Sequence, residues 1–340
     1  MGITVIGSLN YDLVTYTDRI PEAGETFKAN SFETHTGGKG LNQTVAISKL
    51  KQIDAGYKIQ MVGNVGKDAF GEQLLGYLKK NNVETSNVGT QSDVSTGVAT
   101  ILVEEKMSGQ NRILITEGAN GKTTYTDDEL AKIFNNDDDS ESNHMIVFQH
   151  EIPDPVSMMK WFNANKKNYT IVYNPSPFHP LQKEDWSLFD VLVVNEIESL
   201  QIIKNIYPQN YVDMVETSIK NGFVEAYFKI CEELQKNVMN ATKLAIVIIT
   251  LGSQGVLFSS AENQTVQYLP AIQVEKVVDT TGAGDTFLGG VVTQLYQGKS
   301  LKQAIQFSTF ASSLTIQTPG AAESIPYYPD VVSNMNSNLK

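Results

Sequence analysis

Short apolar runs alternate with segments of helical period along most of the chain. Six runs rich in Val and Ile are expected to be buried strands: Ile3–Ile6, Ile59–Val62, Met145–Phe148, Thr170–Tyr173, Val191–Val194 and Leu244–Thr250. Apolar residues spaced three or four apart predict helices over Leu41–Lys51, Gly71–Lys80, Val156–Asn165 and Thr286–Gln297. Continuous apolar strands joined by helices are typical of a parallel sheet covered on both faces. The expected fold is therefore an α/β, doubly wound, mostly parallel sheet.

Two segments depart from this pattern. Residues 13–36 and 96–116 alternate polar and apolar positions, which predicts half-exposed antiparallel strands, with a turn near Ser108-Gly109 in the second segment. Together they are expected to pair into a small separate sheet that covers a site or packs against another copy. Residues 205–240 predict a helical insertion, and residues 135–143 predict a solvated loop.

Composition limits the class of protein. The 340 residues suffice for one large α/β domain or two smaller ones, and a net charge of −12 argues against a nucleic-acid partner. A single cysteine excludes a disulfide framework within the chain. The four histidines show no metal-binding spacing and are interpreted as loop residues: His35, His144, His150 and His179. The sequence shows no secretory signal and no run of membrane length, which predicts a cytoplasmic protein, with the nucleus as a further candidate compartment.

Polar residues follow five of the predicted strands. They are Gly7–Asp12, Gln149–Glu151, Asn174–Pro177, Asn195–Glu198 and Thr250–Gly255. Each group alone reads as ordinary loop or cap chemistry. The carboxyl ends of parallel strands meet at one edge of a sheet, however, so the five groups are expected to line one site. Amides and carboxylates with little aromatic character suit a polyhydroxylated substrate.

The stretch Val278–Thr286, of sequence VDTTGAGDT, reads as a strand end, a tight turn and a helix start. The free N–H groups of a first helical turn bind a phosphate-like anion. Asp285 is then placed to take a proton from a hydroxyl that attacks phosphorus. The alternative interpretation is an N-capping aspartate after a glycine turn.

A second compact motif, Gly37–Gln43 of sequence GGKGLNQ, places Lys39 and Asn42 as donors beside a backbone that approaches a ligand closely. The alternative is a simple turn and helix start. Two other glycine motifs are rejected. Gly121-Lys122-Thr123 lacks the earlier glycine of a P-loop, and Gly282-x-Gly284 lacks the third glycine of a dinucleotide fingerprint.

These residues together resemble the ribokinase branch of the PfkB family of carbohydrate kinases. The resemblance extends from Gly7–Asp12 to Gly320–Ser324 and includes both signatures, GGKG-x-NQ and DTTGAGD. The segment Gln149–Pro153, the intact Asn195-Glu196-x-Glu198 motif and the insertion at 205–240 are most similar to fungal members. The resemblance implies a Rossmann-like (ribokinase-like) kinase domain over 1–12, 37–95 and 117–340. It also implies a β-sheet lid over 13–36 and 96–116, which often serves as a dimer interface.

The resemblance also implies roles for individual residues. The residues implied to hold the sugar are Asn10, Asp12, Gly38, Lys39, Asn42, Glu151 and Asp285. Asp285 matches the catalytic base, and Gly282, Ala283 and Gly284 match the anion hole. The residues implied on the nucleotide side are Asn195 and Glu198, which organise Mg²⁺ and phosphate, with Thr250, Gly252, Gly255 and Gly284. A loop for a monovalent cation such as K⁺ is implied at Asp279, Thr281, Thr315, Thr318, Gly320 and Ser324, where Thr318-Pro319 replaces the usual basic pair.

The activity implied is ATP-dependent phosphorylation of D-ribose at its terminal O5 hydroxyl by a homodimer. Three alternatives stay open at this point. They are a kinase for another sugar or a nucleoside, a non-catalytic sugar-binding sensor on the same fold, and a dinucleotide-dependent oxidoreductase, which the missing fingerprint disfavours.

Overall fold

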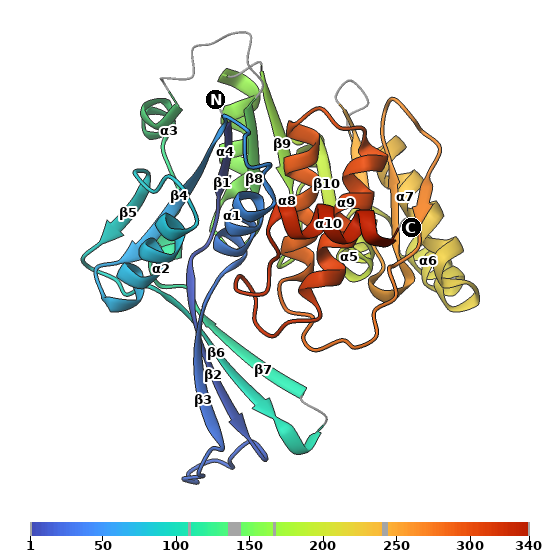
Figure 1. Ribbon diagram of the computed structural model, residues 1–340. Coiled ribbons are helices and arrows are strands. Elements are labelled where there is room, and N and C mark those ends of the chain that lie inside the picture. The colour runs from blue at the N-terminus through green and yellow to red at the C-terminus, as the bar shows by residue number, and fades with distance from the viewer. Residues whose placement is uncertain (1, 108–109, 135–143, 166–167, 240–243, 339–340) are drawn as a thin grey trace.

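The computed structural model describes residues 2–107, 110–134, 144–165, 168–239 and 244–338, which form two sheets (Figure 1). The turn expected at Ser108-Gly109 and the loop expected at 135–143 lie outside the described residues. The large sheet has nine strands in the order β13-β12-β11-β10-β9-β8-β1-β4-β5. The second sheet has four strands in the order β3-β2-β6-β7.

The large sheet is parallel except at one edge. Its strands are β1 (Gly2–Ile6), β4 (Lys58–Gly66), β5 (Val88–Gln91), β8 (His144–Phe148), β9 (Tyr169–Tyr173), β10 (Val191–Asn195), β11 (Ile246–Thr250), β12 (Val256–Ser259) and β13 (Gln267–Leu269). There β12 pairs antiparallel with β11, and β13 pairs antiparallel with β12. All six predicted strands are confirmed, although β11 begins two residues later than predicted. The φ of 43° at Ala245 is incompatible with an extended strand and delays its start.

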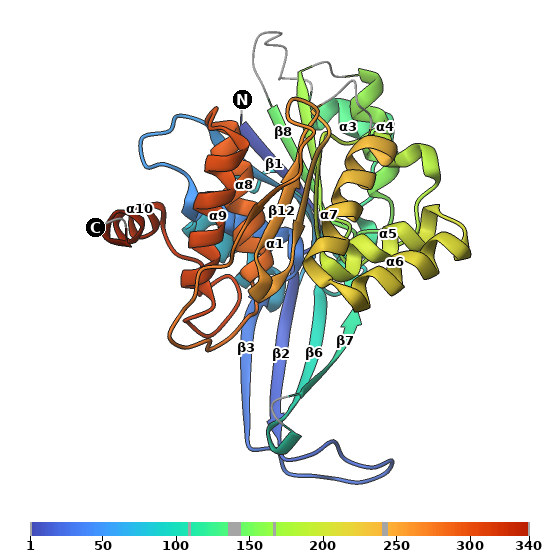
Figure 2. The ribbon, with the colours of Figure 1, turned by 90° about the vertical axis from the view of Figure 1, so that its right-hand side faces the viewer.

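Helices cover both faces of this sheet (Figure 2). One layer contains α1 (Lys39–Leu50), α2 (Ala69–Lys80), α8 (Ala283–Tyr296) and α9 (Leu301–Thr315), with α10 (Tyr328–Asn338) packed on α9; the other contains α3 (Asp127–Phe134), α4 (Pro155–Asn165), α5 (Glu196–Ile206), α6 (Gln209–Asn221) and α7 (Phe223–Glu233). Successive strand residues point to opposite faces, so Val5 joins the first core and Ile6 the second. The predicted α/β doubly wound fold is confirmed.

The helices differ from the predictions mainly at their ends. The helix α8 begins three residues before Thr286, because Gly282 adopts a left-handed conformation (φ 76°) that starts the helix at once. The predicted helical insertion at 205–240 contains two helices that Gly222 separates, followed by a π-helical turn over Leu234–Val238. The interpretation of all histidines as loop residues is wrong for two of them. His35 lies in β3, and His144 lies in β8, where burial and a contact with Thr4 Oγ1 (3.1 Å) hold it.

The small sheet projects from the edge of the large sheet at which β1 ends (Figure 1). Its strands are β2 (Asn10–Thr17), β3 (Ser31–Gly37), β6 (Gly97–Glu104) and β7 (Gln110–Thr116). The pairs β2–β3 and β6–β7 are antiparallel as expected, but the central pair β2–β6 is parallel. Both central strands leave the large sheet in the same direction, which explains the parallel pairing. Asn10 and Asp12 therefore lie on the small sheet.

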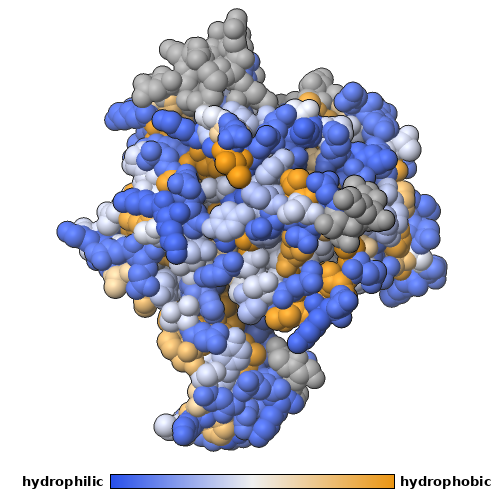
Figure 3. All heavy atoms as spheres, in the orientation of Figure 1, coloured by the Kyte–Doolittle hydropathy of each residue, from blue (hydrophilic) through white to orange (hydrophobic). Residues whose placement is uncertain are grey.

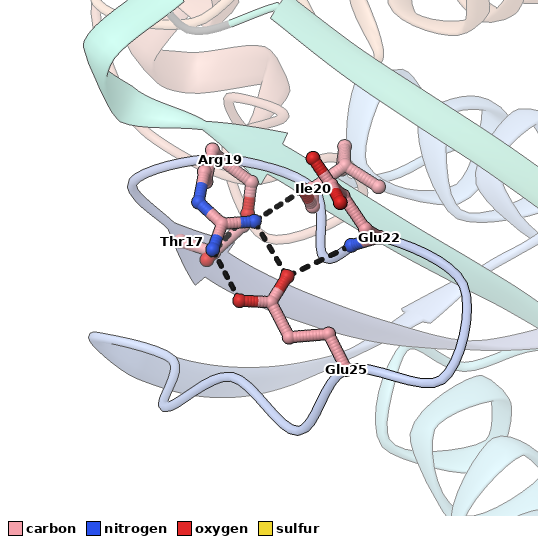
Figure 4. Close-up of polar contacts among 5 residues, drawn as sticks. All are labelled: Thr17, Arg19, Ile20, Glu22 and Glu25. Atoms are coloured by element: carbon pink, nitrogen blue, oxygen red, sulfur yellow. Dashed lines mark hydrogen bonds and ion pairs between the residues drawn. The ribbon is translucent and has the colours of Figure 1, made fainter.

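The loop between β2 and β3 is held by a compact polar cluster (Figure 4). The Arg19 guanidinium pairs with both carboxylate oxygens of Glu25, one of which also accepts from the Glu22 backbone N–H at 2.9 Å. The Arg19 guanidinium lowers the pKa of Glu25 to about 2. The same guanidinium lies 4.4 Å from the ring centroid of Phe27. These contacts give the tip of the small sheet a defined shape.

Candidate active site

Asp285 lies in the first turn of α8, close to α1. Its Oδ1 accepts from Gln43 Nε2 at 3.0 Å and its Oδ2 accepts from Asn42 Nδ2 at 3.3 Å. The two helices approach this closely because Gly289 has no side chain. A Cβ added at Gly289 would lie 2.5 Å from the Cβ of Ala46 on α1. The packing of α1 on α8 thus brings the two sequence motifs together.

Burial dominates the electrostatics of Asp285. Desolvation raises its pKa above the ordinary value of 3.8, although the Lys39 ammonium and the Gln43 amide oppose the rise. Burial lowers the pKa of Lys39, but Asp285, Glu151 and Glu198 together outweigh it, so the net pKa of Lys39 is raised. Lys39 therefore stays charged among carboxylates, and Asp285 holds a proton more readily than a surface aspartate does.

Gln43 is a functional candidate that the sequence predictions missed. Its side chain is 1% exposed, donates to both Asp285 and Asn174 Oδ1 (3.1 Å), and accepts from Gln149 Nε2 at 2.7 Å. The signal was present, because Gln43 ends the GGKG-x-NQ motif. Gln43 ties the carboxylate of Asp285 to the ends of β8 and β9.

Glu151 organises the turn before α1. One carboxylate oxygen, Oε2, accepts from Ser8 Oγ at 2.5 Å and from the Lys39 backbone N–H at 2.9 Å. Gly38 precedes Lys39 with φ 87°, and a Cβ there would lie 2.7 Å from the backbone nitrogen of Asn10. Only glycine fits this close approach, so the turn places Lys39 and Glu151 beside the start of β2.

A cavity of about 470 Å³ opens where the small sheet meets the large one. Its lining includes Asn10, Ile115, Asn120, His150 and Glu151. Burial lowers the pKa of His150 to about 4, with a contribution from His179, so this imidazole is neutral near pH 7. The predicted sugar residues Asn10 and Glu151 thus share one cavity.

Asp12 extends this polar region along β2. Burial raises its pKa to about 7, Glu151 and Glu323 add to the rise, and His35, its partner on β3, opposes it. A carboxylate whose pKa lies near neutrality changes charge within the working range of pH.

A second cavity, of about 380 Å³, lies between α8, α9 and β11. Four predicted nucleotide-side residues line it: Thr250, Gly252, Gly255 and Gly284. Its other wall is apolar and includes Val256, Ile272, Val274, Phe287 and Ile316. This composition suits a flat heterocycle at one end and polar groups at the other. A Cβ built on Gly284 would meet no atom within 4 Å, so the turn of α8 faces open space here.

Asn195 and Glu198 are not part of that lining. Asn195 Oδ1 accepts from the Glu198 backbone N–H at 2.7 Å, and Glu198 Oε2 accepts from the Asn195 backbone N–H at 3.0 Å. This reciprocal pair is the capping box that starts α5. Asn195 pairs with Thr250 across β10 and β11, which places the capping box next to the nucleotide-side cavity.

The predicted cation residues cluster around the turn before α8. Asp279 Oδ1 accepts from the Thr281 hydroxyl at 2.6 Å, and Oδ2 accepts from the Gly320 backbone N–H at 3.0 Å. Burial raises the pKa of Asp279, but these hydrogen bonds outweigh it, and the net pKa is lowered. Two of the three remaining hydroxyls are engaged elsewhere: Thr315 with Thr286 at 3.0 Å, and Ser324 with the Ala321 carbonyl at 2.8 Å.

The oxygen atoms at the two predicted ion sites are of the kinds that K⁺ and Mg²⁺ bind. Carbonyl, hydroxyl and carboxylate oxygens of the Asp279–Gly320 region are hard ligands of the type that K⁺ accepts. Glu198 supplies a carboxylate beside the nucleotide-side cavity. Among the described residues, no group of three or more His, Cys, Asp or Glu side chains forms a ready metal site.

The same part of the chain contains no helix long and apolar enough to cross a membrane.

The chain is similar in sequence and in fold to known proteins. The model of the pfkB family carbohydrate kinases matches residues 2–327. The chain is 38% identical to a ribokinase of Schizosaccharomyces pombe over 338 residues, which cover 99% of this chain and 98% of that protein. Two solved structures are similar over 97–99% of each chain: a ribokinase of Thermotoga maritima (TM-score 0.78, 28% identity) and an Arabidopsis thaliana ribokinase complexed with ribose and ATP (TM-score 0.76, 27% identity).

Proposed function

The chain belongs to the pfkB family of carbohydrate kinases, and from this premise we propose that it is a ribokinase. It transfers the γ-phosphoryl group of ATP to the terminal hydroxyl of D-ribose, giving ADP and D-ribose 5-phosphate. The bond from the γ-phosphorus to the bridging oxygen of ADP breaks, a bond from phosphorus to ribose O5 forms, and the hydroxyl proton passes to a base.

The observation that carries the proposal is the position of Asp285. Its neighbour Gly284 lines the nucleotide-side cavity, and its carboxylate receives hydrogen bonds from α1, which also carries Lys39. The raised pKa of a buried carboxylate strengthens it as a base relative to a surface aspartate. We infer that Asp285 accepts the proton from the terminal hydroxyl as this oxygen attacks phosphorus.

The turn Gly282–Gly284 supplies the anion hole. The N–H groups of the first turn of a helix have no partner within that helix, and the helix dipole favours negative charge there. The Ala283 N–H contacts the Thr280 carbonyl only at 3.3 Å. Charge that develops on the transferring phosphoryl oxygens is therefore stabilised by N–H groups already held in place.

The sugar is oriented by Asn10 and Glu151, which line the first cavity, together with Asp12, Gly38, Lys39 and Asn42. Among the described residues, Asn42 Oδ1 is buried without a hydrogen-bond partner. A buried acceptor without a partner costs free energy unless a ligand donates to it, and a sugar hydroxyl is such a donor. Holding the hydroxyl close to both Asp285 and ATP lowers the barrier by proximity.

ATP occupies the second cavity, with Thr250, Gly252 and Gly255 on its polar side. Glu198 and Asn195 would hold Mg²⁺ and the phosphates, and the loop of Asp279, Thr281, Thr315, Thr318, Gly320 and Ser324 would hold K⁺. The chemistry that Mg²⁺ would supply is neutralisation of charge on the phosphate oxygens. The chain's own contribution is to position Asp285, the turn Gly282–Gly284 and the sugar-binding side chains.

The small sheet is proposed to cover the sugar and to join two copies of the chain as a homodimer. Both of its edge strands carry exposed apolar side chains, among them Phe32 (59% exposed) on β3 and Leu114 (67%) on β7. In Figure 3 the end of the projecting part is mostly hydrophilic, and hydrophobic residues lie along its sides nearer the body of the molecule. An exposed edge strand with apolar side chains is a surface that another copy can cover.

Release of ADP from ATP tests the function, measured with ribose, fructose, adenosine or no sugar. Ribose is expected to give the fastest turnover. Faster turnover of fructose or adenosine would identify a kinase of another substrate. Ribose binding without ADP release would identify a non-catalytic sensor.

A further inference from the structure

Asn120 belongs to none of the motifs that predict the site, yet it contacts Asn10 directly. Its Nδ2 donates to Asn10 Oδ1 at 2.7 Å, and both side chains line the cavity of about 470 Å³. Asn120 is 2% exposed and Asn10 is 3% exposed. The short 3₁₀ helix Gly118–Lys122 presents Asn120, and it starts at Gly118, whose φ of 53° turns the chain.

Backbone groups fix the orientation of the Asn120 amide. The Leu9 N–H donates to Asn120 Oδ1 at 2.8 Å, and Asn120 Nδ2 donates to the Leu9 carbonyl at 3.1 Å. A backbone N–H can only donate and a carbonyl can only accept, so the oxygen and nitrogen ends of Asn120 are determined. Because Asn120 offers a donor to Asn10, Asn10 must turn its oxygen toward Asn120. Asn10 therefore keeps its own Nδ2 for another partner.

Gly97 leaves the space that this contact needs. It pairs with Asn10 across β2 and β6. A Cβ at Gly97 would lie 2.3 Å from Asn120 Nδ2 and 2.4 Å from Asn10 Oδ1, within the hydrogen bond itself. Three separate segments thus converge on one side-chain amide at the edge of the cavity.

We propose that Asn120 is a positioning residue that fixes the amide of Asn10 so that Asn10 presents an N–H donor to the sugar. This inference rests on the proposed function, in which Asn10 contacts ribose. One sugar hydroxyl then accepts a hydrogen bond from Asn10. A fluorine in place of that hydroxyl keeps a weak acceptor, whereas a hydrogen keeps none. The structure thus assigns the direction of one hydrogen bond in substrate recognition.

The test compares binding of deoxy and deoxyfluoro analogues of ribose, substituted at one secondary hydroxyl at a time, by calorimetry. For the wild-type protein we expect that, at one position of the sugar, the deoxyfluoro analogue binds at least about threefold more tightly than the deoxy analogue. In Asn120→Asp, a carboxylate oxygen replaces the donor and accepts from Asn10, whose oxygen then faces the sugar. The ratio of the Kd of the deoxy analogue to the Kd of the deoxyfluoro analogue is then expected to fall to about one. The KM for ribose is expected to rise roughly tenfold, whereas kcat changes far less.

Asn64→Asp is the matched control, because Asn64 is 3% exposed and its amide contacts Thr123 and Gln91 instead of Asn10. In this control, the ratio of the two Kd values, deoxy to deoxyfluoro analogue, is expected to equal that of the wild type. If Asn120→Asp does not fold, Asn10→Asp removes the donor directly and is expected to abolish the same preference. An unchanged ratio in a folded Asn120→Asp or Asn10→Asp protein would overturn the assignment. Failure of the wild type to phosphorylate ribose would instead overturn the proposed function.

Discussion

Gln43 Nε2 donates a hydrogen bond to Oδ1 of Asp285 at 3.0 Å, although the two residues lie on different helices and 242 positions apart in sequence. Gln43 is itself held by Gln149 and Asn174, from the ends of two strands of the large sheet. The proposed base is therefore oriented by a side chain that the sheet fixes. This contact also stabilises the ionised form of Asp285, since it opposes the rise in pKa that burial causes.

Replacing Gln43 with methionine tests this contact. Gln43→Met keeps most of the volume but removes the donor, so the pKa of Asp285 is expected to rise further. The acidic limb of the pH profile of kcat/KM then moves to higher pH, and kcat falls by about tenfold. The control is Gln294→Met, a buried glutamine on α8 itself, which is expected to leave the profile in place. Identical pH profiles for Gln43→Met and the wild type would contradict the role of Gln43.

Ribose binding is expected to depend on pH through Asp12. Its pKa of about 7 means that the carboxyl is largely protonated below pH 7 and ionised above it. An ionised carboxylate accepts sugar hydroxyls more strongly, so the Kd for ribose should rise roughly tenfold between pH 8 and pH 6. The facing groups Glu151, His35 and Glu323 set the position of this transition. Calorimetry with Asp12→Asn should show weaker binding that no longer varies over this range; a variation like that of the wild type would assign the dependence to another group.

The same raised pKa predicts a trade-off between binding and stability. Between pH 4 and pH 7 the folded protein holds the Asp12 proton more tightly than the unfolded chain does. This group therefore lowers the free energy of unfolding progressively as pH rises through that range. Asp12→Asn removes the effect and is expected to raise Tm by on the order of a few degrees at pH 8, with a smaller gain toward pH 4. A lower Tm at pH 8 would show that Asp12 stabilises the fold.

The regular parts of the fold could be predicted from the sequence because local periodicity determines them. Buried strands such as Val191–Val194 are apolar throughout, and α1 follows Gly38, whose φ of 87° favours glycine. The strands β12 and β13 are absent from the predicted set, and β13, at the edge of the sheet, is only three residues long with no fully buried residue. The parallel pairing of β2 with β6 was also missed, because it depends on where each strand leaves the large sheet.

Site residues that belong to a sequence motif could be predicted, whereas residues that reach the site only through tertiary packing could not. Asp285, Lys39 and Asn42 belong to compact motifs, and the structure brings them together. The role of Asn120 depends on its contact with Asn10, which lies 110 residues away in sequence. The only motif next to Asn120 is Gly121-Lys122-Thr123, which lacks the earlier glycine of a P-loop. The capping box of Asn195 and Glu198 is visible in the sequence, whereas its position beside Thr250 follows from strand register.

The proposed cation loop predicts activation by K⁺. At fixed ionic strength, K⁺ is expected to raise kcat well above its value in Na⁺, because an ion bound near Asp279 fixes the turn that carries Gly282–Gly284. A shift of about 1 Å in that turn can cost 10²-fold in rate. Asp279→Ala should abolish both this activation and the rise in Tm that K⁺ causes. Equal rates in K⁺, Na⁺ and a bulky organic cation would show that Thr318-Pro319 has removed the site.

The exposed apolar residues of the small sheet predict a homodimer. Light scattering is expected to report a dimer for the wild type, and Leu114→Asp should convert it to a monomer, because a charge cannot be buried unpaired in the interface. The matched control is Ile53→Asp, since Ile53 is also apolar and is 74% exposed, but lies outside the small sheet. A wild-type monomer at micromolar concentration, or a dimer that survives Leu114→Asp, would contradict this interface.

The most direct test of the central claim is ribose-dependent ADP release by the wild type and by Asp285→Asn, measured beside ribose binding by calorimetry. The asparagine keeps the size of Asp285 but cannot take the hydroxyl proton. Turnover is expected to fall by about 10²–10⁴-fold, while the Kd for ribose changes little. Turnover close to that of the wild type in Asp285→Asn, with ribose bound normally, would contradict the assignment of Asp285 as the base.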